Sequence, residues 1–164
     1  MIQMNKNRWV KLVLSIMICQ AAGLIGSIFT SQSVNTWYQN IQKPSFNPPS
    51  WVFGPVWTTL FLMMGISLYL ILIKRMSKKV KLGIVLFGVQ LVLNILWSLF
   101  FFGLQDPLLG FIEITILWVF IALTIYQFRK IDKRSSYLLI PYILWVSFAA
   151  ILNLSIWLLN SNIV

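Results

Sequence analysis

The sequence predicts an all-α membrane protein, a bundle of five transmembrane helices, on three observations. Hydrophobic residues make up 59% of the 164-residue chain and charged residues only 10%, far from the balance of a soluble domain. Five apolar stretches reach the about 20 residues that a helix needs to cross a bilayer core. The basic residues lie in three short clusters between these stretches. We expect one membrane domain over residues 1–164.

The first span is expected at residues 9–30, after a basic N-terminus. A signal peptide begins in the same way, but this apolar run exceeds a normal signal core and has no clear cleavage site, so we expect it to be retained. Small residues recur four apart, Ala22 with Gly26 and Gly23 with Ser27. Such spacing lets helices approach closely, either inside the bundle or across a homodimer.

The connection that follows, residues 31–51, is the one long loop, and its second half is rich in proline and tryptophan. Residues 37–57 read WYQNIQKPSFNPPSWVFGPVW and hold three of the eight tryptophans and four of the six prolines. Proline fixes its own φ and restricts the residue before it. We therefore expect a stiff, structured loop that holds something in place.

The other four spans are joined by short connections and are expected at residues 52–73, 82–102, 107–128 and 136–160. Short connections favour antiparallel neighbours packed in one bundle. The fourth span has a clear start, with Asp106 predicted as its N-cap and Pro107 as its first helical residue.

The distribution of charge predicts the orientation of the chain. The formal net charge is +10, and twelve of the thirteen basic residues lie on one side of the predicted membrane, with only Lys43 on the other. By the positive-inside rule the N-terminus is cytoplasmic, while the first loop and the C-terminus face outward. Because the basic clusters act as topology determinants, we expect no nucleic-acid partner.

Histidine is absent and the chain has one cysteine, Cys19, in an apolar run. This composition excludes an internal disulfide, histidine-based metal sites and Ser-His or Cys-His catalysis. We expect no metal site, no obligatory cofactor and no conventional catalytic constellation. A haem would find no imidazole ligand, so a tetrapyrrole would be held by stacking and shape.

The fifth span carries polar and aromatic side chains on one face. At about 100° per residue, Trp145, Ala149 and Asn153 fall on the same side as Tyr142. Ala149 leaves room between the larger side chains. An amide such as Asn153 must find a partner inside a bilayer.

The third span repeats this pattern, since Gln90, Asn94 and Trp97 share a face. The second span opens with Trp57, and Phe61 lies one turn beneath it. Two interpretations stay open. The amides can stabilise helix pairs while the tryptophans form interfacial belts, or these side chains can line a ligand pocket.

Glu113 is the only acidic residue well inside a predicted span. A charge there is costly and is usually paired or functional, so we expect a structural partner, with a role in a ligand path as the alternative. A lone carboxylate does not make an aspartic protease, which needs two. Residues 123–129 match a loose cholesterol-contact pattern that is common and weakly specific.

The WY, KP, PPSW and PVW elements, in this order, resemble the first loop and second-helix entrance of the tryptophan-rich sensory proteins. These are also called translocator proteins or peripheral-type benzodiazepine receptors. Two later segments fit as well: NILWSLFF from Asn94, and PYILW at residues 141–145, continuing through Ala149 to Asn153. The resemblance covers nearly the whole chain.

The resemblance implies a five-helix membrane protein, often a homodimer, that binds porphyrins, haem and synthetic isoquinoline or benzodiazepine ligands under the first loop. With the residue pattern, it gives these ligand-binding candidates: Tyr38, Trp51, Trp57, Phe61, Asn94, Trp97, Phe100, Trp145, Ala149 and Asn153. In eukaryotic relatives a sterol motif lies near the end of the fifth helix. Residues 160–164 have neither tyrosine nor a basic residue, so that motif is not matched here.

Some bacterial relatives promote the light- and oxygen-dependent breakdown of protoporphyrin, for which two pocket tryptophans are implicated. By resemblance these are Trp57 and Trp145, the candidate catalytic residues of this chain. An indole stacked on an excited porphyrin can donate an electron, and a closed pocket keeps the radical pair from water.

The expected function is therefore that of an integral membrane receptor or sensor for porphyrins and similar hydrophobic ligands, placed in a bacterial cell membrane. Membrane lipid, the tetrapyrrole ligand and a second copy of the chain are the expected partners. Two alternatives stay open, a carrier for a hydrophobic ligand and a non-catalytic membrane scaffold. Five spans do not divide into the inverted repeats of many secondary transporters.

Overall fold

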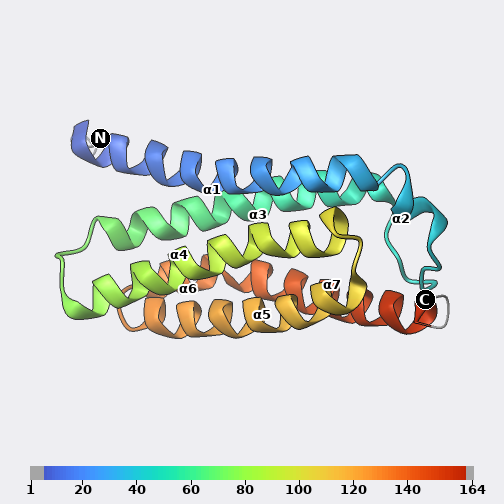
Figure 1. The fold of residues 1–164 in the computed structure, drawn as a ribbon. Coiled ribbons are helices and arrows are strands. Elements are labelled where there is room, and N and C mark those ends of the chain that lie inside the picture. The colour runs from blue at the N-terminus through green and yellow to red at the C-terminus, as the bar shows by residue number, and fades with distance from the viewer. Residues whose placement is uncertain (1–5, 162–164) are drawn as a thin grey trace.

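A computed structural model describes residues 6–161, which form a bundle of long helices that run side by side (Figure 1). The described elements, in chain order, are α1 (Lys6–Ser33), α2 (Trp37–Asn40), α3 (Ser50–Leu72), α4 (Lys78–Ser98), the π-helix η1 (Leu99–Gly103), α5 (Pro107–Arg129), α6 (Lys133–Leu138) and α7 (Ile140–Asn160).

Five helical stretches within residues 6–161 are long and apolar enough to cross a membrane, which confirms the predicted fold class. They are Asn7–Ser33, Ser50–Leu72, Lys78–Gly103, Pro107–Arg129 and Lys133–Asn160. Each includes most of a predicted span, and the ends differ by a few residues. The fifth stretch is built from α6 and α7, which meet at Leu139.

Side-chain caps begin three of these helices. Asp106 accepts a hydrogen bond from the Leu109 N–H at 2.9 Å and Pro107 occupies the first turn of α5, as predicted from the sequence. Ser77 accepts from the Val80 N–H at the start of α4, and Asp132 from the Arg134 N–H at the start of α6. The start of each helix is thus fixed locally.

The three basic clusters gather at one end of the bundle. The start of α1, the α3–α4 connection and the α5–α6 connection lie at that end, whereas α2 and the last turn of α7 lie at the opposite end (Figure 1). The sequence therefore predicted correctly which segments share an end. Which compartment each end faces stays a prediction.

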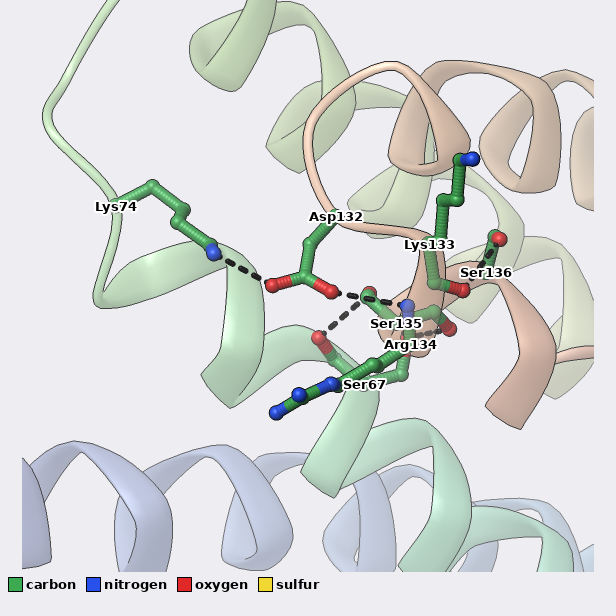
Figure 2. A network of polar contacts seen from close by, with 7 residues as sticks. All are labelled: Ser67, Lys74, Asp132, Lys133, Arg134, Ser135 and Ser136. Atoms are coloured by element: carbon green, nitrogen blue, oxygen red, sulfur yellow. Dashed lines mark hydrogen bonds and ion pairs between the residues drawn. The ribbon is translucent and has the colours of Figure 1, made fainter.

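Direct polar contacts join α3 to α6 at the basic end, as Figure 2 shows. Ser135 donates to the Ser67 carbonyl and Ser67 donates to the Ser135 carbonyl, both at 2.9 Å. The Lys74 ammonium lies 2.5 Å from a carboxylate oxygen of Asp132. By hydrogen bonding to this carboxyl group, Lys74 lowers the pKa of Asp132.

Small residues of α1 and α3 face the interior of the bundle. A Cβ added at Gly65 of α3 would meet the Ile16 Cα at 2.6 Å, and one added at Gly23 of α1 would meet the Phe61 ring at 2.6 Å. At Gly26 it would meet the Ser98 hydroxyl at 3.1 Å. These small residues therefore serve packing within the chain.

Candidate functional site

A cavity of about 380 Å³ lies between α1, α3 and α4 in the half of the bundle nearest α2. Its volume falls at the small end of the range of ligand pockets, roughly 300–1,000 Å³. The aromatic side chains among its lining residues are Tyr38, Phe53, Trp57, Phe61, Trp97 and Phe102.

Half of the predicted ligand-binding residues line this cavity: Tyr38, Trp57, Phe61, Asn94 and Trp97. The other half do not, namely Trp51, Phe100, Trp145, Ala149 and Asn153. Trp51 is 75% exposed at the start of α3, and Phe100 is half-buried in η1.

Aromatic rings from α3 and α4 form one wall. The ring of Trp57 lies 5.6 Å from that of Phe61 and 6.4 Å from that of Trp97, measured between centroids. Trp97 in turn stacks on Phe101, with 5.5 Å between centroids and 18° between the planes. Flat rings in this arrangement present a broad apolar surface to the cavity.

Asn153 fixes the indole of Trp97 from behind. Its side-chain oxygen accepts from the Trp97 indole N–H at 3.1 Å, and its amide nitrogen donates to the Pro107 carbonyl at 2.7 Å. Asn153 is buried, and both interactions cross between helices. Asn153 thus acts on the cavity through Trp97 without lining it.

Asn94 brings a polar group to the cavity. Its amide nitrogen donates to the Tyr142 hydroxyl at 3.0 Å, and Tyr142 donates to the Gln90 side-chain oxygen at 2.9 Å. These bonds hold the Asn94 amide in one orientation. Among residues 6–161, nothing donates to its side-chain oxygen, which leaves that oxygen as a hydrogen-bond acceptor for a ligand.

Trp145 lies one side chain behind the cavity. Its ring contacts Phe53, which does line the cavity, at 6.0 Å, and Phe148 at 5.5 Å. Its buried indole N–H has no hydrogen-bond partner among the described residues. Ala149, one turn further along α7, is buried in the bundle core. The two candidate catalytic tryptophans, Trp57 and Trp145, therefore do not face the same cavity.

The first loop closes the cavity on the α2 side. Tyr38 donates through its hydroxyl to the Asn47 side-chain oxygen at 2.6 Å, and its ring lies 5.6 Å from that of Phe102. Burial raises the pKa of Tyr38 to about 12, so the phenol remains a donor at neutral pH.

Two further contacts hold the loop. The Lys43 ammonium donates to three carbonyls, those of Tyr38 (2.5 Å), Gln39 (3.1 Å) and Ile41 (3.0 Å), around the end of α2. The backbone of Gln42 exchanges two hydrogen bonds with the Asn160 side chain, at 3.0 and 2.9 Å. The loop is thereby joined to the last turn of α7.

Sequence reasoning missed the wall that α1 contributes. The residues of α1 that line the cavity include Gln20, Gly23, Ser27 and Thr30. The sequence showed the small-residue spacing at this place, but that spacing alone indicates close packing as readily as an open space. Gly54, on the facing side of α3, also lines the cavity. Its position before Pro55 is the one feature that distinguished it in the sequence, and that feature does not indicate a cavity.

Glu113 departs from expectation. It is buried on α5 at 4% exposure and does not line the cavity. Neither carboxylate oxygen has a hydrogen-bond partner within residues 6–161, so the predicted structural partner is not found there.

The same part of the chain contains no group of three or more Cys, Asp or Glu side chains that could hold a metal ion.

Known proteins resemble this chain over most of its length. The model of the TspO/MBR family matches residues 15–158. A tryptophan-rich protein TspO from Chlorobaculum tepidum is 48% identical, over 96% of this chain and 99% of the relative. A tryptophan-rich protein TspO from Archaeoglobus fulgidus is 45% identical, over 92% and 97%. The translocator protein of Ovis aries is 32% identical, over 91% and 89%.

Proposed function

This chain belongs to the TspO/MBR family, and on that premise we propose that it is a membrane receptor or sensor for porphyrins and similar flat, hydrophobic ligands. The ligand site is the cavity between α1, α3 and α4. The chain is an integral, multi-pass membrane protein. The basic end faces the cytoplasm of a bacterial cell, and the first loop faces outward.

The aromatic wall carries this proposal. Trp57, Phe61 and Trp97 line one side of a mostly apolar cavity, and Asn94 adds one oriented amide. A flat conjugated ring gains from stacking on such a wall, and the amide oxygen can accept from a pyrrole N–H. The chain has no histidine to ligate a haem iron, so recognition acts on the macrocycle itself.

Slow photochemistry is a second part of the proposal. An excited porphyrin in the cavity takes one electron from the indole of Trp57, which gives a porphyrin radical anion and an indole radical cation. Molecular oxygen then adds to the radical anion, and return of the electron from this adduct to the indole restores Trp57 and leaves a neutral porphyrin peroxide. Trp145 lies behind Phe53, so its indole is one ring further from the ligand. Trp57 is therefore the primary donor, and Trp145 contributes less.

A dark titration followed by illumination tests both parts. Protoporphyrin IX is added to the protein in lipid nanodiscs, and tryptophan quenching is measured for the wild type, Trp57→Phe, Trp145→Phe and the control Trp9→Phe. Trp9 is 54% exposed and does not line the cavity. We expect saturable quenching, with affinity reduced about two- to tenfold in Trp57→Phe, given about 0.5–1.5 kcal/mol for an aromatic pair.

The outcomes separate the candidate functions. On illumination, porphyrin absorbance should fall fastest in the wild type and the control, more slowly in Trp145→Phe and slowest in Trp57→Phe. Saturable quenching without loss of porphyrin absorbance would support porphyrin binding and contradict the proposed photochemistry. If quenching is linear and is the same in Trp57→Phe as in the wild type, the cavity is not the ligand site, and a scaffold function is favoured. Ligand uptake into sealed vesicles would indicate a carrier.

The exposed apolar face of α1 has two proposed partners, membrane lipid and a second copy of the chain. Val10, Val13, Met17 and Ile25 are among its exposed residues.

A further inference from the structure

We propose that the ligand enters the cavity sideways from the lipid phase, through a slot between α1 and α3. This inference rests on the proposed function, because it assigns the route by which a ligand reaches that same cavity. It concerns residues of α1 and α3 that line the cavity but do not belong to the aromatic wall.

The helices α1 and α3 are in backbone contact near Gly65, and towards α2 they both line the cavity. At Gly65, a Cβ would meet the Ile16 Cα at 2.6 Å, so the two backbones nearly touch there. One to two turns towards α2, the Gln20 side chain donates to the Thr58 carbonyl at 3.0 Å. Beyond that bond the space between the helices is the cavity itself. Gln20 therefore marks the closed end of the slot.

Two rows of residues form the edges of this slot. Six residues both line the cavity and are exposed: Leu24, Ser27 and Ser31 on α1, and Ser50, Gly54 and Thr58 on α3. Each row follows one helix face at a spacing of three to four residues. At 1.5 Å per residue the rows run for about 10–12 Å. A cavity with exposed lining on two facing helices opens between them.

Three of the four hydroxyl groups on these edges, those of Ser27, Ser31 and Thr58, are bonded within their own helix. Ser27 donates to the Leu24 carbonyl at 2.7 Å, and Thr58 donates to the Gly54 carbonyl at 2.9 Å. Ser31 likewise donates to the Ile28 carbonyl at 3.0 Å. Because these three donors are bonded within their own helices, an apolar ligand can pass them without stripping water or breaking a bond between helices.

The route through the first loop is closed by contrast. To open it, the ligand would have to break the Tyr38–Asn47 hydrogen bond, the three Lys43 contacts and the paired bonds between Gln42 and Asn160. The lateral route breaks none of these. The ligand class that fits is a flat amphipathic molecule already dissolved in the bilayer, entering edge-on.

Gly54 offers a direct test. Apart from its chain neighbours, an added Cβ there meets nothing within 4 Å, so Gly54→Leu places a branched side chain in the slot without a clash against another helix. Gly88 on α4 also has open space around a Cβ, and it does not line the cavity, so Gly88→Leu is the matched control. Binding of protoporphyrin IX in nanodiscs is followed by stopped-flow quenching.

We expect the association and dissociation rates to fall together in Gly54→Leu, each by at least tenfold, because a blocked slot raises the barrier in both directions. Gly88→Leu should match the wild type. An unchanged association rate in Gly54→Leu would overturn the lateral route, including when affinity falls through faster dissociation, since that pattern is simple filling of the cavity.

A second test needs no porphyrin. In a Cys19→Ala background, Ser98→Cys places a single thiol on the inner wall of the cavity, where Ser98 is buried. An uncharged, membrane-partitioning maleimide should label it, a sulfonated water-soluble maleimide should not, and Gly54→Leu should slow the labelling. Labelling by the charged reagent at the same rate would place the entrance at the loop. If the wild type fails to bind porphyrin while this labelling pattern holds, the proposed ligand is wrong and the slot stands.

Discussion

The two ends of the α1–α3 pair differ, although the same two helices form both. Near the basic end, Gly65 brings α3 against Ile16, and Lys11 donates across to the Leu72 carbonyl at 3.0 Å. Near α2, Gly54 faces open space and the helices enclose a cavity. Gly65 permits close contact between the two helices, whereas Gly54 leaves an opening between them. The comparison shows that small residues acquire their role from the distance to the neighbouring helix.

Substitution of Gly65 gives the largest expected effect. Gly65→Leu cannot be accommodated, because the clash is with the backbone of Ile16, which cannot rotate away. Overpacking costs about 1–3 kcal/mol or more, so we expect a marked fall in thermal stability in detergent. In Gly54→Leu, the midpoint of thermal unfolding should stay close to that of the wild type. Equal destabilisation of the two variants would remove the contrast between the helix ends.

Substitution of Asn153 tests how the Trp97 side of the cavity is held in place. Asn153→Leu keeps a similar volume but removes one bond to the Pro107 carbonyl and leaves the buried Trp97 indole N–H unpaired, at a cost of about 1–3 kcal/mol for that donor. We expect lower stability together with weaker porphyrin binding, because Trp97 loses its fixed orientation. Asn160→Leu, which alters the loop contact, should leave the Trp97 wall intact. Unchanged binding in Asn153→Leu would show that Trp97 needs no support.

The ion pair at the basic end should give the smallest effect. Lys74 lowers the pKa of Asp132, so the pair stabilises the fold above the unfolded-state pKa of about 3.9, and this contribution is lost as the pH falls through the lower folded value. Lys74 is partly exposed, which limits the contribution to about 0.2–1 kcal/mol. Asp132→Asn should lower stability slightly at neutral pH, and the difference from the wild type should shrink as the pH falls below about 3.9. A stability difference that does not change with pH would indicate lost capping of α6.

The sequence was sufficient for the five spans and for the Asp106 cap, because apolar length and local capping depend on nearby residues alone. It also indicated which amides face the interior, such as Asn94 and Asn153. A helical wheel gives a direction but not a depth, so it could not tell that Asn94 lines the cavity while Asn153 lies behind Trp97. The widened turn at η1, where the Leu104 N–H donates to the Leu99 carbonyl at 2.7 Å, has no sequence signature.

The cavity itself could not be located from the sequence for a related reason. Gly23 and Gly54 are equally small, but one lies against Phe61 and the other faces open space. That difference depends on which groups of the neighbouring helices lie opposite each glycine. Tertiary geometry of this kind depends on the whole helix pair and has no local pattern.

The most direct test of the cavity as the ligand site uses bound porphyrin as a photosensitiser. Protein in nanodiscs carrying sub-stoichiometric protoporphyrin IX is illuminated briefly, with azide in the bulk phase to remove diffusing singlet oxygen, and oxidised tryptophans are mapped by mass spectrometry. We predict that oxidation concentrates on Trp57 and Trp97, which line the cavity, and spares the exposed Trp9, Trp51 and Trp118. Oxidation that follows exposure instead, with Trp57 and Trp97 protected, would contradict the assignment.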